Sequence, residues 1–166
     1  MGRVIRWAEA DDLPGLAAVE IAADGVFARV GICFPAGTTM VEECTSPELV
    51  IVAGRPAVGF AMYGWVDGAV HLEQLAVHPE HGRRGIGSAL LAALCDHASA
   101  VADAVTLTTF RDVPWNAPWY ARRGFAVQEP QGWGPEMRAL VARERELGLE
   151  LAPRVVMRRV LRAPGY

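Results

Sequence analysis

Residues 75–91 constrain the fold more than any other part of the chain, because they predict a strand, a glycine-rich turn and the start of a helix. The apolar run 75–77 ends at Pro79, and apolar residues then recur at three- and four-residue spacing through residues 86–101. Between them lies Gly-Arg-Arg-Gly-Ile-Gly at 82–87. Glycines let a backbone approach a ligand, and the free N–H groups of a helix start favour an anion. The segment therefore predicts a site for phosphate, with pyrophosphate as the expected ligand.

Two well-known phosphate loops do not fit this segment. A Walker-type loop ends in Gly-Lys-Ser/Thr, and the segment contains no lysine. A dinucleotide-binding turn needs a third glycine, and after Gly85 and Gly87 that position is Leu90. Another kind of phosphate site is therefore required.

Composition limits the classes of protein that the chain can represent. With 166 residues it is expected to form a single domain, residues 1–166, that holds its own core. No apolar run approaches the roughly 18 residues of a membrane span, and the first residues lack a signal-peptide core. Three cysteines without a Cys-x-x-Cys pair suit a reducing compartment, so we expect a cytoplasmic protein. A net charge of −3 predicts no nucleic-acid partner.

Hydrophobic periodicity and turn residues predict the order of the elements. Strands are expected at 3–8, 49–53, 57–66, 70–77, 105–109, 125–128 and 155–161, and helices at about 13–23, 86–101, 117–123 and 136–147. Asp67-Gly68 predicts a tight hairpin, so the strands from 49 to 77 should form an antiparallel meander. Residues 24–47 are less regular, with a second short helix suggested at 27–32 and broken at 34–37. We interpret this stretch as a lid that faces the substrate.

The turn resembles the acetyl-CoA loop of the GNAT superfamily of N-acetyltransferases, in which Gln/Arg-x-x-Gly-x-Gly/Ala follows a strand and begins a helix. Residues 84–88, Arg-Gly-Ile-Gly-Ser, fit that pattern. Gly82 stands where the family usually has Gln or Arg, and Arg83 stands where many members have glycine. The order of elements also matches over nearly the whole chain.

The resemblance implies an α/β (α+β) fold. Its mixed, mostly antiparallel sheet would have about six to seven strands, flanked by helices and splayed in the middle for acetyl-CoA. Acetyl-CoA would be a co-substrate gripped mostly through backbone N–H groups. The implied contacts are Leu75, Ala76 and Val77 of the strand, Gly82, Arg83, Arg84, Gly85, Ile86, Gly87 and Ser88 of the loop, and Asn116 and Tyr120 further on.

Two ionisable residues on the strand before the loop are candidates for proton transfer. Alternation places His71 and Glu73 on one face, and both charges would be costly over a closed core, so a cleft is expected. By resemblance, His71 stands where protein-lysine acetyltransferases of this fold carry a base glutamate. Arylalkylamine N-acetyltransferases have histidines at both positions. We favour Glu73 as general base, directly or through a water, with His71 as second proton carrier, and the reverse assignment stays open. In the alternative interpretation, Glu73 pairs with an arginine and His71 is an ordinary half-buried histidine.

A second motif lies at residues 120–125, Tyr-Ala-Arg-Arg-Gly-Phe. It resembles the family motif Tyr-x-x-x-Gly-Phe, in which the tyrosine hydroxyl protonates the departing CoA thiolate. Asn116 stands where the family often contacts the pantetheine amide, but it lies four residues before Tyr120 instead of about seven. Also by resemblance, the backbone N–H of Leu75 or Val77 would hold the acetyl carbonyl and pantetheine. The alternative role for Tyr120 is an aromatic helix cap over the core.

These observations predict an acetyl-CoA-dependent N-acyltransferase that acetylates a primary amine of a small molecule by direct attack in a ternary complex. Two alternatives remain, a protein N-terminal or lysine acetyltransferase and a non-catalytic acyl-CoA-binding domain. Four tryptophans are candidates for the amine pocket or for the core: Trp65, Trp115, Trp119 and Trp133. His78 and His81 supply too few ligands for a metal, and no membrane partner is expected. The acceptor, the strictness for acetyl and the oligomeric state, a homodimer included, stay open.

Overall fold

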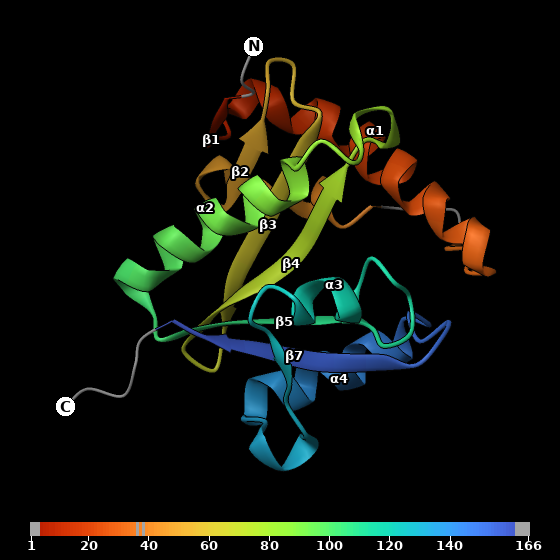
Figure 1. Ribbon diagram of the computed structural model, residues 1–166, viewed down its shortest axis with the longest axis vertical. Coiled ribbons are helices and arrows are strands. Elements are labelled where there is room, and N and C mark those ends of the chain that lie inside the picture. Colours follow the sequence, from red (N-terminus) through yellow and green to blue (C-terminus); the bar gives the residue numbers. More distant parts are fainter. Residues whose placement is uncertain (1–3, 36, 38, 162–166) are drawn as a thin grey trace. The chain divides into compact units, whose positions relative to one another are not determined.

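The computed structural model describes residues 4–35, 37 and 39–161, and the chain falls into two compact units (Figure 1). The first unit comprises Met1–Gly64 and Leu72–His97, and the second comprises Trp65–His71 and Ala98–Tyr166. A seven-stranded sheet has the order β1-β2-β3-β4-β5-β7-β6. Strand β4 belongs to both units, with residues 69–71 in the second and 72–77 in the first.

The elements follow the expected order. The strands are β1 (Ile5–Trp7), β2 (Val50–Ala53), β3 (Gly59–Val66), β4 (Ala69–Val77), β5 (Ala104–Phe110), β6 (Ala126–Val127) and β7 (Arg154–Val160). The helices are α1 (Leu13–Asp24), α2 (Ile86–Val101), α3 (Ala117–Ala121) and α4 (Pro135–Glu146). Strands β4 and β5 are parallel, whereas the pairs β1–β2, β2–β3, β5–β7 and β6–β7 are antiparallel. The mixed, mostly antiparallel sheet confirms the expected fold class.

In the first unit, helices cover both faces of the sheet. Leu16 and Val19 of α1 pack in one cluster with side chains of β2, β3 and β4, among them Phe60. Gly59, next to Phe60, faces the other way, because a Cβ there would lie 3.3 Å from the side chain of Leu90 on α2. Helices α1 and α2 therefore pack on opposite faces of these strands.

In the second unit, α4 packs against the sheet and is tied to the β3–β4 turn. Met137 and Val141 of α4 form a cluster with Val66 and Val156. The carboxylate of Asp67 accepts hydrogen bonds from the backbone N–H groups of Glu136 and Met137, each at 3.0 Å. In return, Glu136 accepts a hydrogen bond from the backbone N–H of Asp67 at 2.8 Å. The turn thus caps the start of α4, where backbone donors lack helical acceptors.

The hairpin prediction at Asp67-Gly68 is confirmed, since both residues have the positive φ angles, 50° and 77°, that a type I′ turn requires. Within 24–47 the suggested second helix is the 3-10 helix η2 (Gly25–Val30), and a further 3-10 helix, η3 (Val41–Glu43), follows. Residue 3 of the first expected strand, and residues 36 and 38 of the lid, lie outside the described residues. No helix within the described residues is long and apolar enough to cross a membrane.

Candidate active site

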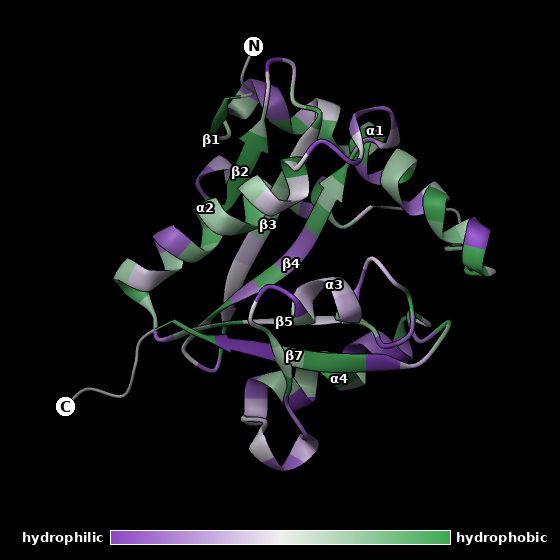
Figure 2. Ribbon diagram, viewed as in Figure 1, coloured by the Kyte–Doolittle hydropathy of each residue, from purple (hydrophilic) through white to green (hydrophobic). Residues whose placement is uncertain are grey.

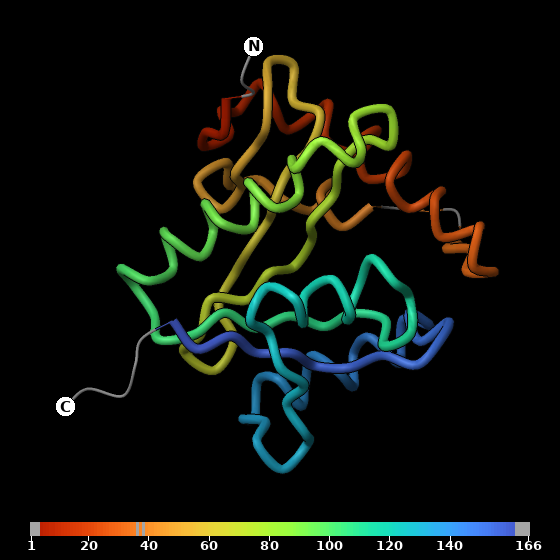
Figure 3. The backbone as a smooth tube through the Cα atoms, viewed as in Figure 1, coloured from red at the N-terminus to blue at the C-terminus, as the bar shows by residue number. Residues whose placement is uncertain are grey.

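The glycine-rich turn lies in the first unit and leaves its backbone open. Figure 3 shows the chain leaving β4, passing the 3-10 helix η5 (Pro79–His81) and entering α2. Arg83 and Gly85 have left-handed backbones, with φ angles of 59° and 77°. Residues 82–85 are exposed, and a Cβ added to Gly85 would meet no atom within 4 Å. A ligand could therefore approach this backbone without displacing protein atoms.

The start of α2 adds the features of an anion site. The helix begins at Ile86, and the backbone N–H of Ala89 donates to the carbonyl of Gly85 at 3.0 Å. The N–H groups of Ile86 and Gly87 precede that first bond, at the positive end of a helix of 16 residues. The side chain of Ile86 is buried, so this residue offers only its backbone to a ligand. Ser88 is the third residue of the same turn.

The strand before the loop presents backbone donors away from β3. The N–H of His78 donates to the carbonyl of Val58 at 2.8 Å, which places this donor on the β3 side. Because successive N–H groups of a strand point to opposite edges, those of Val77 and Leu75 point away from β3. Ala76 is buried in the cluster formed with α1. The expected backbone contacts are thus unobstructed by β3.

The middle of β4 is hydrophilic (Figure 2), and Glu73 is the fifth of the nine residues of this strand. Its side chain is exposed, but its carboxylate lies against the backbone of Gly64 on β3. Partial desolvation raises the pKa of the Glu73 carboxyl above its usual value. A carboxylate with a raised pKa is a stronger base than an ordinary one, and this carboxylate can be reached from solvent.

His71 belongs to the second unit and is almost fully buried, with 3% of its surface exposed. It pairs with Thr106 across the parallel β4–β5 ladder, and a hydrogen bond of 2.8 Å joins its Nδ1 to Thr106 Oγ1. Burial lowers the pKa of His71 to about 4. The ring is therefore neutral at pH 7 and fixed by its partner.

Tyr120 and Asn116 also belong to the second unit. The Tyr120 ring packs edge to face against Trp119 and Phe125, with centroids 5.0 Å and 5.6 Å away, and 9% of the residue is exposed. Burial raises the pKa of its phenol, so the hydroxyl keeps its proton at neutral pH. Asn116 precedes α3, and its Oδ1 accepts a hydrogen bond of 2.7 Å from Thr109. Its amide nitrogen is the group it would offer to pantetheine.

The predicted residues thus fall into two sets, each described within its own unit. The first unit holds Glu73, the strand residues 75–77 and the loop 82–88. The second unit holds His71, Asn116 and Tyr120.

The tryptophans considered for an amine pocket differ in their surroundings. Trp133 is partly buried, donates from Nε1 to the Gln128 carbonyl at 2.8 Å and packs against the α4 cluster. Trp119 carries the Arg123 guanidinium over its ring at 3.7 Å. Trp65 and Trp115 are exposed.

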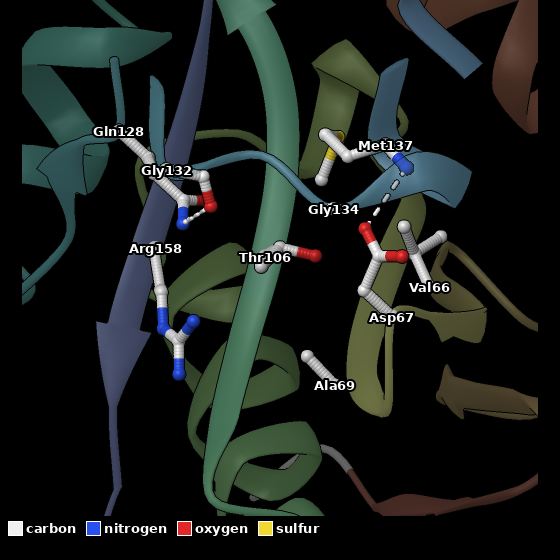
Figure 4. A pocket seen from close by; sticks show the side chains of 9 residues that line it. All are labelled: Val66, Asp67, Ala69, Thr106, Gln128, Gly132, Gly134, Met137 and Arg158. Carbon is white, nitrogen blue, oxygen red and sulfur yellow. Dashed lines mark hydrogen bonds between the residues drawn. The ribbon is translucent and has the colours of Figure 1, made fainter. Parts of the chain in front are cut away.

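The second unit contains a small cavity whose lining includes none of the predicted site residues (Figure 4). Asp67, Thr106, Met137 and Arg158 are among the residues that line it. Its volume of about 40 Å³ leaves room for about one water molecule, which is too little for an acyl acceptor. Asp67, which lines this cavity, is the residue that caps the start of α4.

Sequence reasoning missed a buried carboxylate in the first unit. Glu20 on α1 has 2% of its surface exposed, and it accepts hydrogen bonds from the backbone N–H groups of Met40 and Val41, each at 3.1 Å. It also accepts a 2.7 Å bond from the side-chain amide of Gln74 on β4. Glu20 therefore fastens the lid segment beside η3 to the central strand. The available signal was a charged residue four positions after Leu16, on the apolar stripe of α1.

Comparison with known proteins agrees with this architecture. Residues 46–127 match a family described as an acetyltransferase (GNAT) domain. N-acetylglutamate synthase from Neisseria gonorrhoeae, solved with coenzyme A and N-acetyl-glutamate, has a TM-score of 0.71 and 21% identity, covering 98% of this chain. The chain spans only 36% of that protein's length.

Two further solved structures match over nearly their full length. The ribosomal-protein-S18-alanine N-acetyltransferase from Escherichia coli has a TM-score of 0.68 and 20% identity, covering 99% of this chain and 97% of the other. A GNAT-family acetyltransferase from Staphylococcus aureus has a TM-score of 0.73 and 13% identity, covering 97% and 100%. These likenesses establish the fold, and the sequence match extends across β2 to β6. Residues 46–127 thus match the GNAT acetyltransferase family, and the chain has the fold of GNAT acetyltransferases.

Proposed function

We propose that this chain transfers an acetyl group from acetyl-CoA to a primary amine of a small molecule, by direct attack in a ternary complex. The observation that carries the proposal is the exposed backbone of residues 82–85 at the start of α2. Left-handed backbone at Arg83 and Gly85, open space beside Gly85 and the helix dipole together suit a pyrophosphate.

Binding of acetyl-CoA is assigned mainly to the backbone. The N–H groups of the first turn of α2 would hold the pyrophosphate, and Arg83 and Arg84 add positive charge beside it. The N–H groups of Leu75 and Val77, which point away from β3, would align the pantetheine arm and the acetyl carbonyl. The side-chain amide nitrogen of Asn116 would contribute a further bond to pantetheine.

The chemistry then needs two proton transfers. As the amine nitrogen attacks the acetyl carbonyl carbon, Glu73 accepts its proton, directly or through a water. The carbon–sulfur bond breaks, and Tyr120 gives its proton to the departing thiolate, so that CoA leaves as a thiol. Exchange with solvent restores both residues.

The surroundings of the two candidate bases support Glu73 over His71. Desolvation raises the pKa of Glu73 and so strengthens it as a base, and its side chain is exposed. The same effect lowers the pKa of His71 to about 4, which makes its ring a poor proton acceptor. His71 is also buried and bonded to Thr106.

A substitution in the loop tests the site. Gly85→Asp places a carboxylate where the pyrophosphate would lie, so acetyl-CoA should no longer raise the melting temperature. Gly148→Asp is the matched control, because Gly148 is also left-handed, at φ 72°, with no atom within 4 Å of an added Cβ. The control should keep the full ligand-induced shift. Equal shifts in the two variants would contradict the assignment of the loop.

The acceptor needs a separate experiment, because fold alone does not select it. The similar structures include a synthase of N-acetylglutamate and an enzyme named for an alanine of ribosomal protein S18. Thiol release should be screened with a panel of small primary amines and with peptides. Turnover only with peptides would instead favour a protein acetyltransferase. Stabilisation by acetyl-CoA without thiol release from any acceptor would favour a non-catalytic acyl-CoA-binding domain.

A further inference from the structure

Gly64 on β3 and Glu73 on β4 make an unusually close approach within the first unit. An ideal Cβ built on Gly64 would lie 2.5 Å from Oε1 of Glu73 and 3.4 Å from its Cδ. Real Cβ atoms essentially never come within 3.0 Å of another heavy atom in this way. The Glu73 carboxylate therefore occupies the space that any other residue at position 64 would fill.

The backbone gives no other reason for glycine at this position. Gly64 does not have the left-handed conformation that favours glycine. A glycine inside a strand costs about 0.5–1 kcal/mol relative to alanine, and it often marks a place where another group comes close. Here the group that comes close is a carboxylate with a proposed catalytic role.

The obstacle at Gly64 differs from those at other tightly packed glycines of the first unit. At Gly59, an added Cβ would meet the backbone oxygen of Ala76 at 3.0 Å, which cannot move without disturbing the sheet. At Gly64, the obstacle is the far end of a flexible side chain. A methyl group there would displace the carboxylate and leave the strands in place.

We propose that Gly64 is a positioning residue, which leaves open the space that holds the Glu73 carboxylate where it accepts the proton of the amine. The inference rests on the proposed function, because Glu73 has that role only there. The contact with Gly64 also explains how an exposed side chain loses part of its hydration. One side of the carboxylate faces backbone instead of water, and desolvation is the cause of its raised pKa.

The first test measures the carboxylate itself and needs no enzymatic activity. The carboxyl carbon of Glu73 is titrated by NMR in the wild type and in Gly64→Ala, with Glu73→Gln to assign the signal. We expect its pKa to fall towards the ordinary glutamate value in Gly64→Ala. Gly15→Ala on α1 is the control, because an added Cβ there meets no atom within 4 Å, and it should leave the titration unchanged. Identical titrations in the wild type and Gly64→Ala would overturn the proposal.

The second test is a double-mutant cycle with the acceptor found in the amine screen. We expect Gly64→Ala to lower kcat by about 10- to 100-fold, since small misplacements of a catalytic group carry losses of this size. KM for acetyl-CoA and the melting temperature should stay close to those of the wild type. In a Glu73→Gln background, the same substitution should change kcat little, because the group it displaces is already inactive.

Three results would overturn the positioning role. They are an unchanged kcat in Gly64→Ala, an equal loss in the Glu73→Gln background, and a loss confined to KM for acetyl-CoA. If none of the acceptors on the panel causes the wild type to release thiol, the proposed function fails. The NMR titration still decides whether Gly64 holds the Glu73 carboxylate.

Discussion

His71 and Glu73 are two residues apart on β4, yet their surroundings differ sharply. His71 is 3% exposed and bonded to Thr106, and burial lowers its pKa to about 4. Glu73 is exposed with its carboxylate against Gly64, and partial desolvation raises its pKa. Desolvation disfavours the charged form of both groups, so it raises the pKa of the carboxyl group and lowers the pKa of the imidazole.

One physical cause thus gives two neighbouring residues opposite changes in basicity. Desolvation makes the carboxylate a stronger base, whereas it makes the imidazole a weaker one. The burial that lowers the pKa of the imidazole also keeps solvent away from it. We therefore expect Glu73 to dominate turnover and His71 to dominate stability.

The largest effect should be the loss of turnover in Glu73→Gln. A glutamine keeps the shape of the side chain but cannot accept the proton, so kcat for thiol release should fall by about 10²- to 10⁴-fold. His71→Asn should lose less than about tenfold, because an amide group can still hydrogen-bond to Thr106. Both variants should bind acetyl-CoA, as measured by its effect on the melting temperature. The opposite ranking of the two variants would make His71 the base.

The next effect is the dependence of stability on pH that His71 imposes. Its folded pKa of about 4 lies below its unfolded value of 6.5, so the unfolded chain binds the extra proton between these two values. The contribution of His71 to stability is therefore fully present above pH 6.5 and is lost as the pH drops towards 4. The loss is about 3 kcal/mol, at 1.36 kcal/mol per pKa unit. Urea unfolding of the wild type and His71→Asn at pH 7 and pH 4.5 measures the effect. Equal losses in both proteins would show that His71 is not its source.

The contrast between the two residues could not be predicted from the sequence, although most of the fold could. The hairpin at Asp67-Gly68 and the glycine turn before α2 depend on local signals, and both occur where expected. Alternation placed His71 and Glu73 on one face, but it gives no information on what covers each of them. His71 is hydrogen-bonded to Thr106, and the Glu73 carboxylate lies against Gly64. Both of these neighbours lie on other strands.

Long-range contacts explain what else the sequence left open. The Asp67 carboxylate caps a helix that begins 68 residues later in the chain, and Glu20 binds both the lid and Gln74. The position of β7 between β5 and β6 likewise depends on pairing between distant strands. The residues proposed for chemistry came from motif resemblance. Only the structure reveals the burial and the neighbours that distinguish their roles.

A smaller effect should follow from removing the partner of His71. Thr106→Val leaves the buried Nδ1 without its hydrogen bond, which costs about 1–3 kcal/mol. Thr106→Ser keeps the hydroxyl and is the matched control. Urea unfolding at pH 7 should rank Thr106→Val well below Thr106→Ser. Equal stabilities would mean that the bond does not hold the ring.

The smallest effect should come from Glu73 and should have the opposite sign. Its folded pKa lies above the unfolded value of 4.5, so the folded chain holds the extra proton between these two values. The stability that Glu73 contributes is present at low pH and is lost as the pH rises through the folded pKa. Glu73→Gln, which stays neutral, should therefore stabilise the protein at pH 7, by well under about 1 kcal/mol because solvent screens an exposed group. Urea unfolding at pH 7 and pH 4 measures this gain, which should vanish at the lower pH. A destabilised Glu73→Gln at pH 7 would mean that the charged carboxylate is favoured in the folded protein, which is inconsistent with the contrast drawn with His71.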